Sequence, residues 1–315
     1  MLCARTHSCG LNQHECPGGR AGDGPVITVR PDRARTLTVQ ALAFGTAAAG
    51  TIGKTFMFAR LLILFYAIVS YAVFLVSFLY ALGFVGNYLV PKSIDVGGRS
   101  NLSEAIVVDL LLLGIFAIQH SIMARPVFKR WWAKILPEAC QRITYVLLSS
   151  LIMLLLFWQW RPIPVSVWQI DGIAALLLIG VYWLGWVIVL ASTFMIDHFD
   201  LSGLRQGFFA LRGVEIPAQS FKTPLLYKVV RHPLMLGFLL AFWATPEMTA
   251  GHLLFAIMTT AYILVALQFE ERDLIAEFGT TYQQYRQRVP MLLPRIFGRR
   301  RSEDRQPPRP VGVPR

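Results

Sequence analysis

Long apolar runs are the feature of this chain that most restricts its fold. The hydrocarbon core of a bilayer is about 30 Å thick, and a helix needs roughly 20 apolar residues to cross it. Four such runs occur, at residues 58–84, 104–122, 143–160 and 172–195. Hydrophobic residues make up 55% of the chain and charged residues only 15%, which is unlike a soluble enzyme. We therefore expect an all-α fold, a polytopic integral membrane helical bundle.

Two further apolar runs lie closer together, at residues 234–245 and 253–269. Between them, Pro246 and Gly251 mark a break in the helical pattern. These runs predict a C-terminal helical hairpin with arms of comparable length. Its first arm is too short to cross a bilayer unless the helix begins before Pro233. With the hairpin, the chain has about six spans.

The distribution of Lys and Arg predicts the orientation of these spans. Successive loops carry two, five, one, five and no Lys or Arg residues, and the tail from Arg272 onward carries ten. Positively charged loops stay on the cytoplasmic side. Six spans with both termini inside satisfy this alternation, and we expect a multi-pass protein of a bacterial inner membrane. The formal net charge of +12 then reflects topology. We expect no nucleic-acid partner, because the charges flank spans instead of lining one face.

The ends of the chain differ from its centre in composition. Residues 1–56 are polar and rich in Gly and Arg, and we interpret them as a disordered or wrongly included extension before a membrane domain at 57–296. Residues 297–315 are basic and proline-rich, and we expect a disordered tail. The early Cys and His residues form no Cys-x-x-Cys unit, so we expect no metal site.

Several ionisable residues fall at the cytoplasmic ends of the predicted spans. Such groups are costly at membrane depth and are usually functional where they occur. The alternative is that each one anchors its own helix at the interface. The residues are His120, Asp197, His198, Arg231, His232, Glu270 and Glu271.

Motifs of several soluble enzyme classes do not occur in the sequence. There is no Gly-x-Gly-x-x-Gly or P-loop sequence, and no Gly-x-Ser-x-Gly elbow. The residues therefore give no support to a hydrolase or to a soluble type of nucleotide-binding protein.

Two sets of motifs carry a resemblance to known families. Arg231-His232-Pro233, Glu270-Glu271, Gly279, Tyr282, Tyr285 and Val289-Pro290 resemble the C-terminal signature of the isoprenylcysteine carboxyl methyltransferase superfamily. Gln119-His120-Ser121, Gln159-Trp160-Arg161-Pro162 and Asp197-His198-Phe199-Asp200 are similar to the methanethiol S-methyltransferases. Superfamily members often have Tyr at the position of Met235, which lacks the phenolic hydroxyl.

The resemblance implies a membrane enzyme that transfers a methyl group from S-adenosyl-L-methionine to methanethiol, releasing dimethyl sulfide. The expected catalytic residues are Arg231, His232 and Glu270, with Arg231 and Glu270 meeting around one ligand. Cofactor-binding roles are expected for His232, Pro233, Leu234, Gly237, Glu270, Glu271, Tyr282 and Tyr285. A substrate pocket is expected at His120, Asp197 and His198.

The chemistry is compatible with these residue types. Methyl transfer from a sulfonium to a thiolate mainly needs positioning, desolvation and a deprotonated sulfur. A nearby cation such as Arg231, or a base such as His232, would favour the thiolate.

Three rival functions share features of this pattern. They are an isoprenylcysteine-type carboxyl methyltransferase, a membrane sterol reductase that uses a nicotinamide cofactor, and a non-catalytic nurim-like membrane protein. We expect a small thiol and the lipid bilayer as partners, and we predict no protein partner.

The Lys and Arg pattern generates a test of orientation. The hairpin turn around Glu247 should face the periplasm, while Arg231 and Glu270 should face the cytoplasm. A membrane-impermeant thiol reagent should then label Glu247→Cys in intact cells. Labelling that needs permeabilised cells would reverse the orientation.

Overall fold

The molecule is a bundle of long helices. The structure is a computed structural model that describes residues 31–98, 100–217 and 221–294, with side chains from residue 56 onward. The long helices are α1 (Pro31–Gly86), α2 (Leu102–Ala124), α4 (Glu138–Gln159), α5 (Gly172–Ile196) and α9 (Ala250–Phe278). The shorter ones are α3 (Pro126–Trp132), α6 (His198–Leu201), α7 (Leu204–Arg212), α8 (Pro233–Trp243) and α10 (Thr280–Arg288), with a 3-10 turn at Leu225–Lys228. The expected all-helical membrane fold is confirmed.

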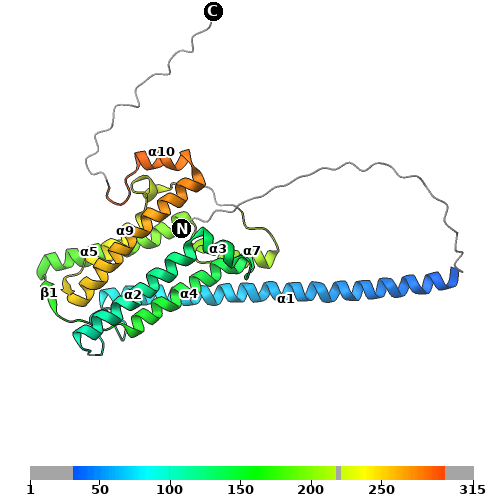
Figure 1. Ribbon diagram of the computed structural model, residues 1–315, viewed down its shortest axis with the longest axis horizontal. Coiled ribbons are helices and arrows are strands. Elements are labelled where there is room, and N and C mark those ends of the chain that lie inside the picture. The colour runs from blue at the N-terminus through cyan, green and yellow to red at the C-terminus, as the bar shows by residue number, and fades with distance from the viewer. Residues whose placement is uncertain (1–30, 99, 218–220, 295–315) are drawn as a thin grey trace, which may run out of the picture.

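The first helix starts earlier than the composition suggests. Pro31 occupies its first position, where proline is favoured, and no proline follows until the helix has ended. Residues 31–56 therefore form the first part of α1, which extends away from the bundle (Figure 1). Residues 1–30 and the predicted tail at 297–315 lie outside the described residues. The domain boundary at Met57 stays a prediction.

Five helices, and not six, are long and apolar enough to cross a membrane within the described part of the chain. The sixth apolar run forms α8, which has 11 residues and is about 16 Å long. Its helix begins at Pro233, because the residue before a proline avoids the helical conformation. The hairpin arms are unequal, since α9 has 29 residues. The prediction of arms of comparable length was wrong.

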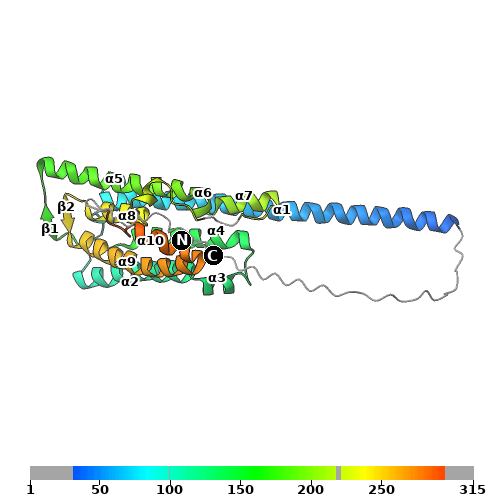
Figure 2. The ribbon, with the colours of Figure 1, turned by 90° about the horizontal axis from the view of Figure 1, so that it is seen from above.

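The bundle has two sides, which are clearest from above (Figure 2). There α1, α5 and α7 lie on one side, and α2, α3 and α9 lie on the other. The helix α4 packs against both α1 and α2. Many large apolar side chains of the long helices are exposed, as expected for helices that face lipid.

The loops with few charges gather at one end of the bundle. A two-stranded antiparallel sheet pairs β1 (Ser166–Gln169) with β2 (Glu247–Thr249), the hairpin turn. The hydroxyl of Thr249 donates to the carboxylate of Asp95 in the first loop. The indole N–H of Trp160 donates to the carbonyl of Ile94 at 3.0 Å. The hairpin turn therefore shares an end with the first and third loops, as the charge alternation predicts.

Helices α5 and α8 touch through their backbones. A Cβ atom added to Gly185 would lie 2.7 Å from the carbonyl oxygen of Gly237, and one added to Gly237 would lie 2.6 Å from that of Gly185. Small residues permit such close approach between membrane helices. This contact fixes α8, and thereby the position of His232 at its N-terminus.

Substitution by alanine should separate this contact from helix propensity. Gly185→Ala adds a methyl group against the backbone of α8, and overpacking of this kind costs about 1–3 kcal/mol. Gly180→Ala, in the same helix, meets no atom within 4 Å and gains the same propensity. In detergent, Gly185→Ala should unfold at a lower temperature than wild type and Gly180→Ala should not. Equal melting temperatures for the two variants would show that the helices do not pack this closely.

Candidate functional site

The segment after α10 holds the two residues that precede Pro233. The backbone N–H of Arg231 donates to the carbonyl of Pro290 at 2.9 Å, and that of His232 donates to Met291 at 3.1 Å. These N–H groups have no partner within α8, because the helix only begins at Pro233. The two ends of the C-terminal motif are thus joined by main-chain hydrogen bonds.

Glu271 is the centre of a buried ion cluster. Its Oε1 accepts from Nε of Arg231 at 2.7 Å and lies 2.5 Å from Nη2 of the same residue. His232 Nε2 lies 3.3 Å from Oε1, and Arg286 Nε lies 3.2 Å from Oε2. The side chains of Arg231 and Glu271 are only 8% and 6% exposed. The cluster joins the segment just before α8 to α9 and α10.

Arg231 also contacts the C-terminal segment of the chain. Its Nη1 donates to the backbone carbonyls of Arg286 and Val289, each at 2.8 Å. The glutamate that contacts Arg231 directly is Glu271, and the expected meeting of Arg231 and Glu270 around one ligand stays a prediction. Consecutive residues of a helix point about 100° apart, so only one of the two glutamates faces Arg231.

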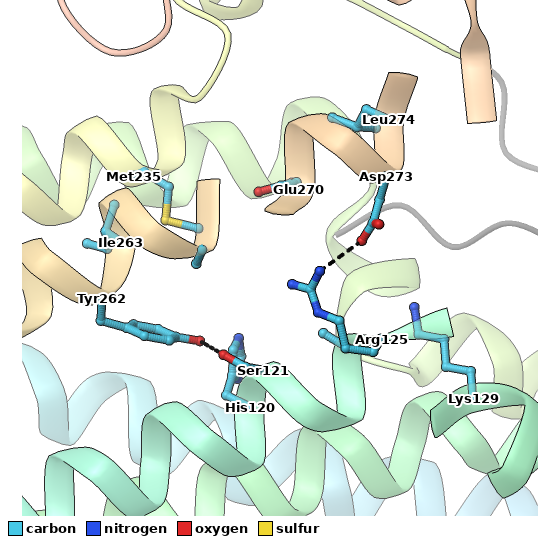
Figure 3. Close-up of a pocket in the computed structure, with 12 residues that line it drawn as sticks. His120, Ser121, Arg125, Lys129, Met235, Tyr262, Ile263, Glu270, Asp273 and Leu274 are labelled. Atoms are coloured by element: carbon cyan, nitrogen blue, oxygen red, sulfur yellow. Dashed lines mark hydrogen bonds and ion pairs between the residues drawn. The ribbon is translucent and has the colours of Figure 1, made fainter. Parts of the chain in front are cut away.

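Glu270 faces a cavity on another side of α9. The cavity has a volume of about 90 Å³ and lies between α2, α3, α8 and α9 (Figure 3). Glu270 Oε2 also lies 3.9 Å from His232 Nδ1, so it connects this cavity with the ion cluster. The lining residues are His120, Ser121, Ala124, Arg125, Lys129, Met235, Tyr262, Ile263, Ala266, Glu270, Asp273 and Leu274.

Polar contacts bridge the cavity from α2 to α9. The hydroxyl of Ser121 donates to that of Tyr262 at 3.3 Å, and Nη1 of Arg125 lies 3.3 Å from the carboxylate of Asp273 (Figure 3). Both contacts therefore tie the two walls together. Met235, at the position where the resemblance suggests Tyr, contributes a thioether to the lining.

Of the expected substrate residues, only His120 lines this cavity. Asp197 caps the N-terminus of α6 and accepts a hydrogen bond from Arg205. The ring of His198 stacks on Phe194, with centroids 4.5 Å apart, and its Nε2 lies 3.1 Å from the hydroxyl of Tyr71. Burial lowers the pKa of His198, although the charge of Asp197 opposes this effect. The structure does not bring these two residues to His120, and local packing accounts for both.

The two predicted tyrosines lie in an aromatic cluster with Phe221. The hydroxyl of Tyr285 donates to the carbonyl of Tyr227 at 2.5 Å. Tyr282 is 1% exposed, and its hydroxyl has no hydrogen-bond partner among the described residues. Burial raises the pKa of Tyr282 and raises that of Tyr285 to about 12, so both phenols are neutral at pH 7.

The expected cofactor residues at the start of α8 have structural explanations. Pro233 is buried at the first helical position, and Gly237 makes the contact with α5. Leu234 is partly buried and does not line the cavity. A direct role for these three residues in cofactor binding stays a prediction.

Sequence reasoning missed several residues that line the cavity. Tyr262 and Asp273 were missed, and they belong with the predicted Glu270 to one stripe of α9 with spacings near multiples of 3.6 residues. Arg125 and Ser121 occupy the matching end of α2. A helical projection of the two runs would have found the stripes, but not that they face each other.

Comparison with known proteins identifies the class to which this helical membrane fold and site belong. Residues 110–269 match the model of a family described as NnrU protein. The chain is 79% identical to methanethiol S-methyltransferase 2 of Bradyrhizobium diazoefficiens over 259 residues, which cover 82% of this chain and 100% of that protein.

More distant relatives extend the comparison. Identity to methanethiol S-methyltransferase of Mycobacterium tuberculosis is 56% over 75% of this chain and 97% of the relative. The nurim homolog of Drosophila melanogaster is 29% identical over 63% of this chain and 88% of its own length. No solved structure matches. The chain belongs to the NnrU protein family and to the family of methanethiol S-methyltransferases.

The ion cluster predicts a large loss of stability on truncation of Arg231. Removing one partner of a buried pair leaves an uncompensated charge and costs about 3–5 kcal/mol. Arg231→Ala should therefore lower the melting temperature in detergent strongly. Arg272→Ala, an exposed arginine next to the glutamate pair, is the control and should unfold close to wild type. Similar melting temperatures for the two variants would contradict the buried ion pair.

Proposed function

We propose that this protein methylates methanethiol with S-adenosyl-L-methionine and releases dimethyl sulfide. Support comes from relatives that cover most of the chain and are named methanethiol S-methyltransferase, at 79% and 56% identity. The structural observation that carries the proposal is the position of Glu270. Its carboxylate lines a cavity between α2 and α9 and also lies 3.9 Å from His232 Nδ1.

The cavity is suited to a small methyl acceptor. Pockets for drug-sized ligands usually measure 300–1,000 Å³, whereas this cavity measures about 90 Å³. It has an apolar wall that includes Met235 and Ile263, which suits a small thiol with a methyl group. This size favours methanethiol over the prenylated acceptor of a carboxyl methyltransferase.

The residues around Glu270 also suit the methyl donor. S-adenosyl-L-methionine would supply an electrophilic methyl group on a sulfonium, together with amino and hydroxyl groups that need acceptors. Glu270 offers a carboxylate, and His232 offers an imidazole next to it. The buried hydroxyl of Tyr282, without a partner among the described residues, would gain a hydrogen bond from a polar ligand. Tyr285 packs beside Tyr282 and would complete the same side of the donor site.

Arg231 and Glu271 have a positioning role in this proposal. Their ion pair and the two carbonyl contacts of Arg231 engage all three nitrogens of that guanidinium within the protein. They fix the position of His232 relative to α9, so that Glu270 faces the cavity. We therefore propose that Arg231 positions the site instead of touching the reacting atoms, while His232 and Glu270 remain proposed site residues.

The proposed location is the inner membrane, with the site on the cytoplasmic side. Its support is the concentration of Lys and Arg at the end of the bundle that carries Arg125, Arg231 and Glu270. The methyl donor is made in the cytosol, so this orientation would give it direct access.

A direct assay tests the function. Cells that express the chain and receive methanethiol should release dimethyl sulfide, measured by headspace gas chromatography. No dimethyl sulfide above the empty-vector level would remove the proposed function. Oxidation of added NADPH in place of methylation would favour a reductase.

Glu270 should control the affinity for the methyl donor. Loss of a charge-assisted contact costs about 1.5–3 kcal/mol, which corresponds to a dissociation constant about ten- to hundredfold larger. Purified Glu270→Gln protein should show this weakening for S-adenosyl-L-methionine in equilibrium dialysis. Glu277→Gln, on the same helix but not in the cavity lining, should bind like wild type. Equal affinity in both variants would place the donor elsewhere.

A further inference from the structure

One wall of the cavity contains a histidine that is embedded in a polar cluster between α2 and α4. The hydroxyl of Tyr145 lies 2.9 Å from Nε2 and 3.1 Å from Nδ1 of His120. Ser149 Oγ lies 3.4 Å from Nδ1 and accepts a hydrogen bond from Gln119 Nε2 at 3.2 Å. The ring also stacks on Phe116, with centroids 5.2 Å apart. The orientation of this imidazole is therefore fixed from several sides.

The place of His120 in the fold points to a chemical role. It lies inside a helix that is long and apolar enough to cross the membrane, where polar side chains are costly and usually functional. It is also part of the cavity lining, with Ser121 and Arg125 farther along α2. His198 also contacts a tyrosine hydroxyl, but it does not line the cavity.

An alkyl thiol needs a proton acceptor before it can act as a nucleophile. The thiolate is the reactive form, and a cysteine thiol has a pKa of about 8.5, so most of it is protonated at pH 7. The arginine and the histidine of the ion cluster do not line the cavity. His232 lies 3.3 Å from Glu271 and 3.9 Å from Glu270, and Arg231 is occupied by Glu271 and two carbonyls.

We propose that His120 is the general base that accepts the thiol proton, and that Tyr145 positions its ring. This inference rests on the proposed function. The S–H proton moves to a ring nitrogen of neutral His120, and the sulfur electron pair forms the new bond to the methyl carbon. The bond between that carbon and the donor sulfur breaks, and its electrons neutralise the sulfonium. The imidazolium then releases its proton to water, so each turnover yields one proton.

Other ionisable groups face the same space and belong to the environment of this base. They are Arg125 at the end of α2, Lys129 on α3, Tyr145 on α4, and Tyr262, Glu270 and Asp273 on α9. Glu270 would stabilise the imidazolium that forms, because opposite charges attract strongly at a site away from bulk water. Arg125 is already paired with Asp273.

Replacement of His120 by glutamine tests this role. Glutamine keeps hydrogen-bonding groups but cannot accept a proton. General base catalysis contributes about 10²–10⁴-fold, so His120→Gln should lower kcat/KM for methanethiol at neutral pH at least about a hundredfold. In wild type, kcat/KM should rise with pH as His120 loses its proton and then level off. In the variant this rising limb of the pH profile should disappear, and the low rate should increase only as the thiol itself ionises.

A second acceptor distinguishes a base from a structural residue. Methaneselenol has almost the same shape as methanethiol but is much more acidic, so it is ionised at neutral pH. Under anaerobic conditions, His120→Gln should methylate methaneselenol at close to the wild-type rate. Equilibrium dialysis should also give an unchanged dissociation constant for S-adenosyl-L-methionine.

Two controls complete the experiment. Tyr145→Phe should reduce activity less than His120→Gln and shift the pH limb without removing it. His252→Gln, at a buried histidine of the opposite end of the bundle, should keep the wild-type pH profile. If His120→Gln loses methanethiol and methaneselenol activity equally, or keeps the wild-type pH limb, the general-base role is overturned. Failure of wild type to form dimethyl sulfide would instead overturn the proposed function.

Discussion

The ion pair between Arg231 and Glu271 is the interaction on which the arrangement of this site depends. Two charges at the edge of the membrane region would be unfavourable alone, but each has its partner within hydrogen-bond distance. The pair joins the segment just before α8 to α9, and the carbonyls of Arg286 and Val289 add the C-terminal segment. With Glu271 fixed in this way, the helical rotation directs Glu270 to the cavity.

Helix packing determines where the other residues of the site lie. The backbone contact between Gly185 and Gly237 determines where α8 lies against α5, and Pro233 determines where α8 begins. On the opposite wall, α2 brings His120 and Arg125 toward α9. The cavity therefore lies between α2 and α3 on one side and α8 and α9 on the other, and its polar groups come from segments far apart in the sequence.

Much of the fold could be predicted from the sequence because lipid imposes simple rules on length and polarity. Four spans and the positions of the charged loops follow from apolar runs and from Lys and Arg. The unequal arms of the hairpin did not follow, since the apolar run at residues 253–269 does not show that α9 continues through charged residues to Phe278. The choice between Glu270 and Glu271 as partner of Arg231 depends on helix rotation, and the separation of His198 from His120 depends on tertiary packing. Neither is encoded in local spacing.

The central claim is that methyl transfer takes place in the cavity between α2 and α9, with Glu270 at its edge. A cryo-electron microscopy structure of the protein with S-adenosylhomocysteine, the product of the donor, would test this most directly. The account predicts density beside Glu270 and Tyr282, with the thioether sulfur directed at the cavity that His120 lines. Density for this ligand at the junction of α5 and α6, beside Asp197 and His198, would contradict it.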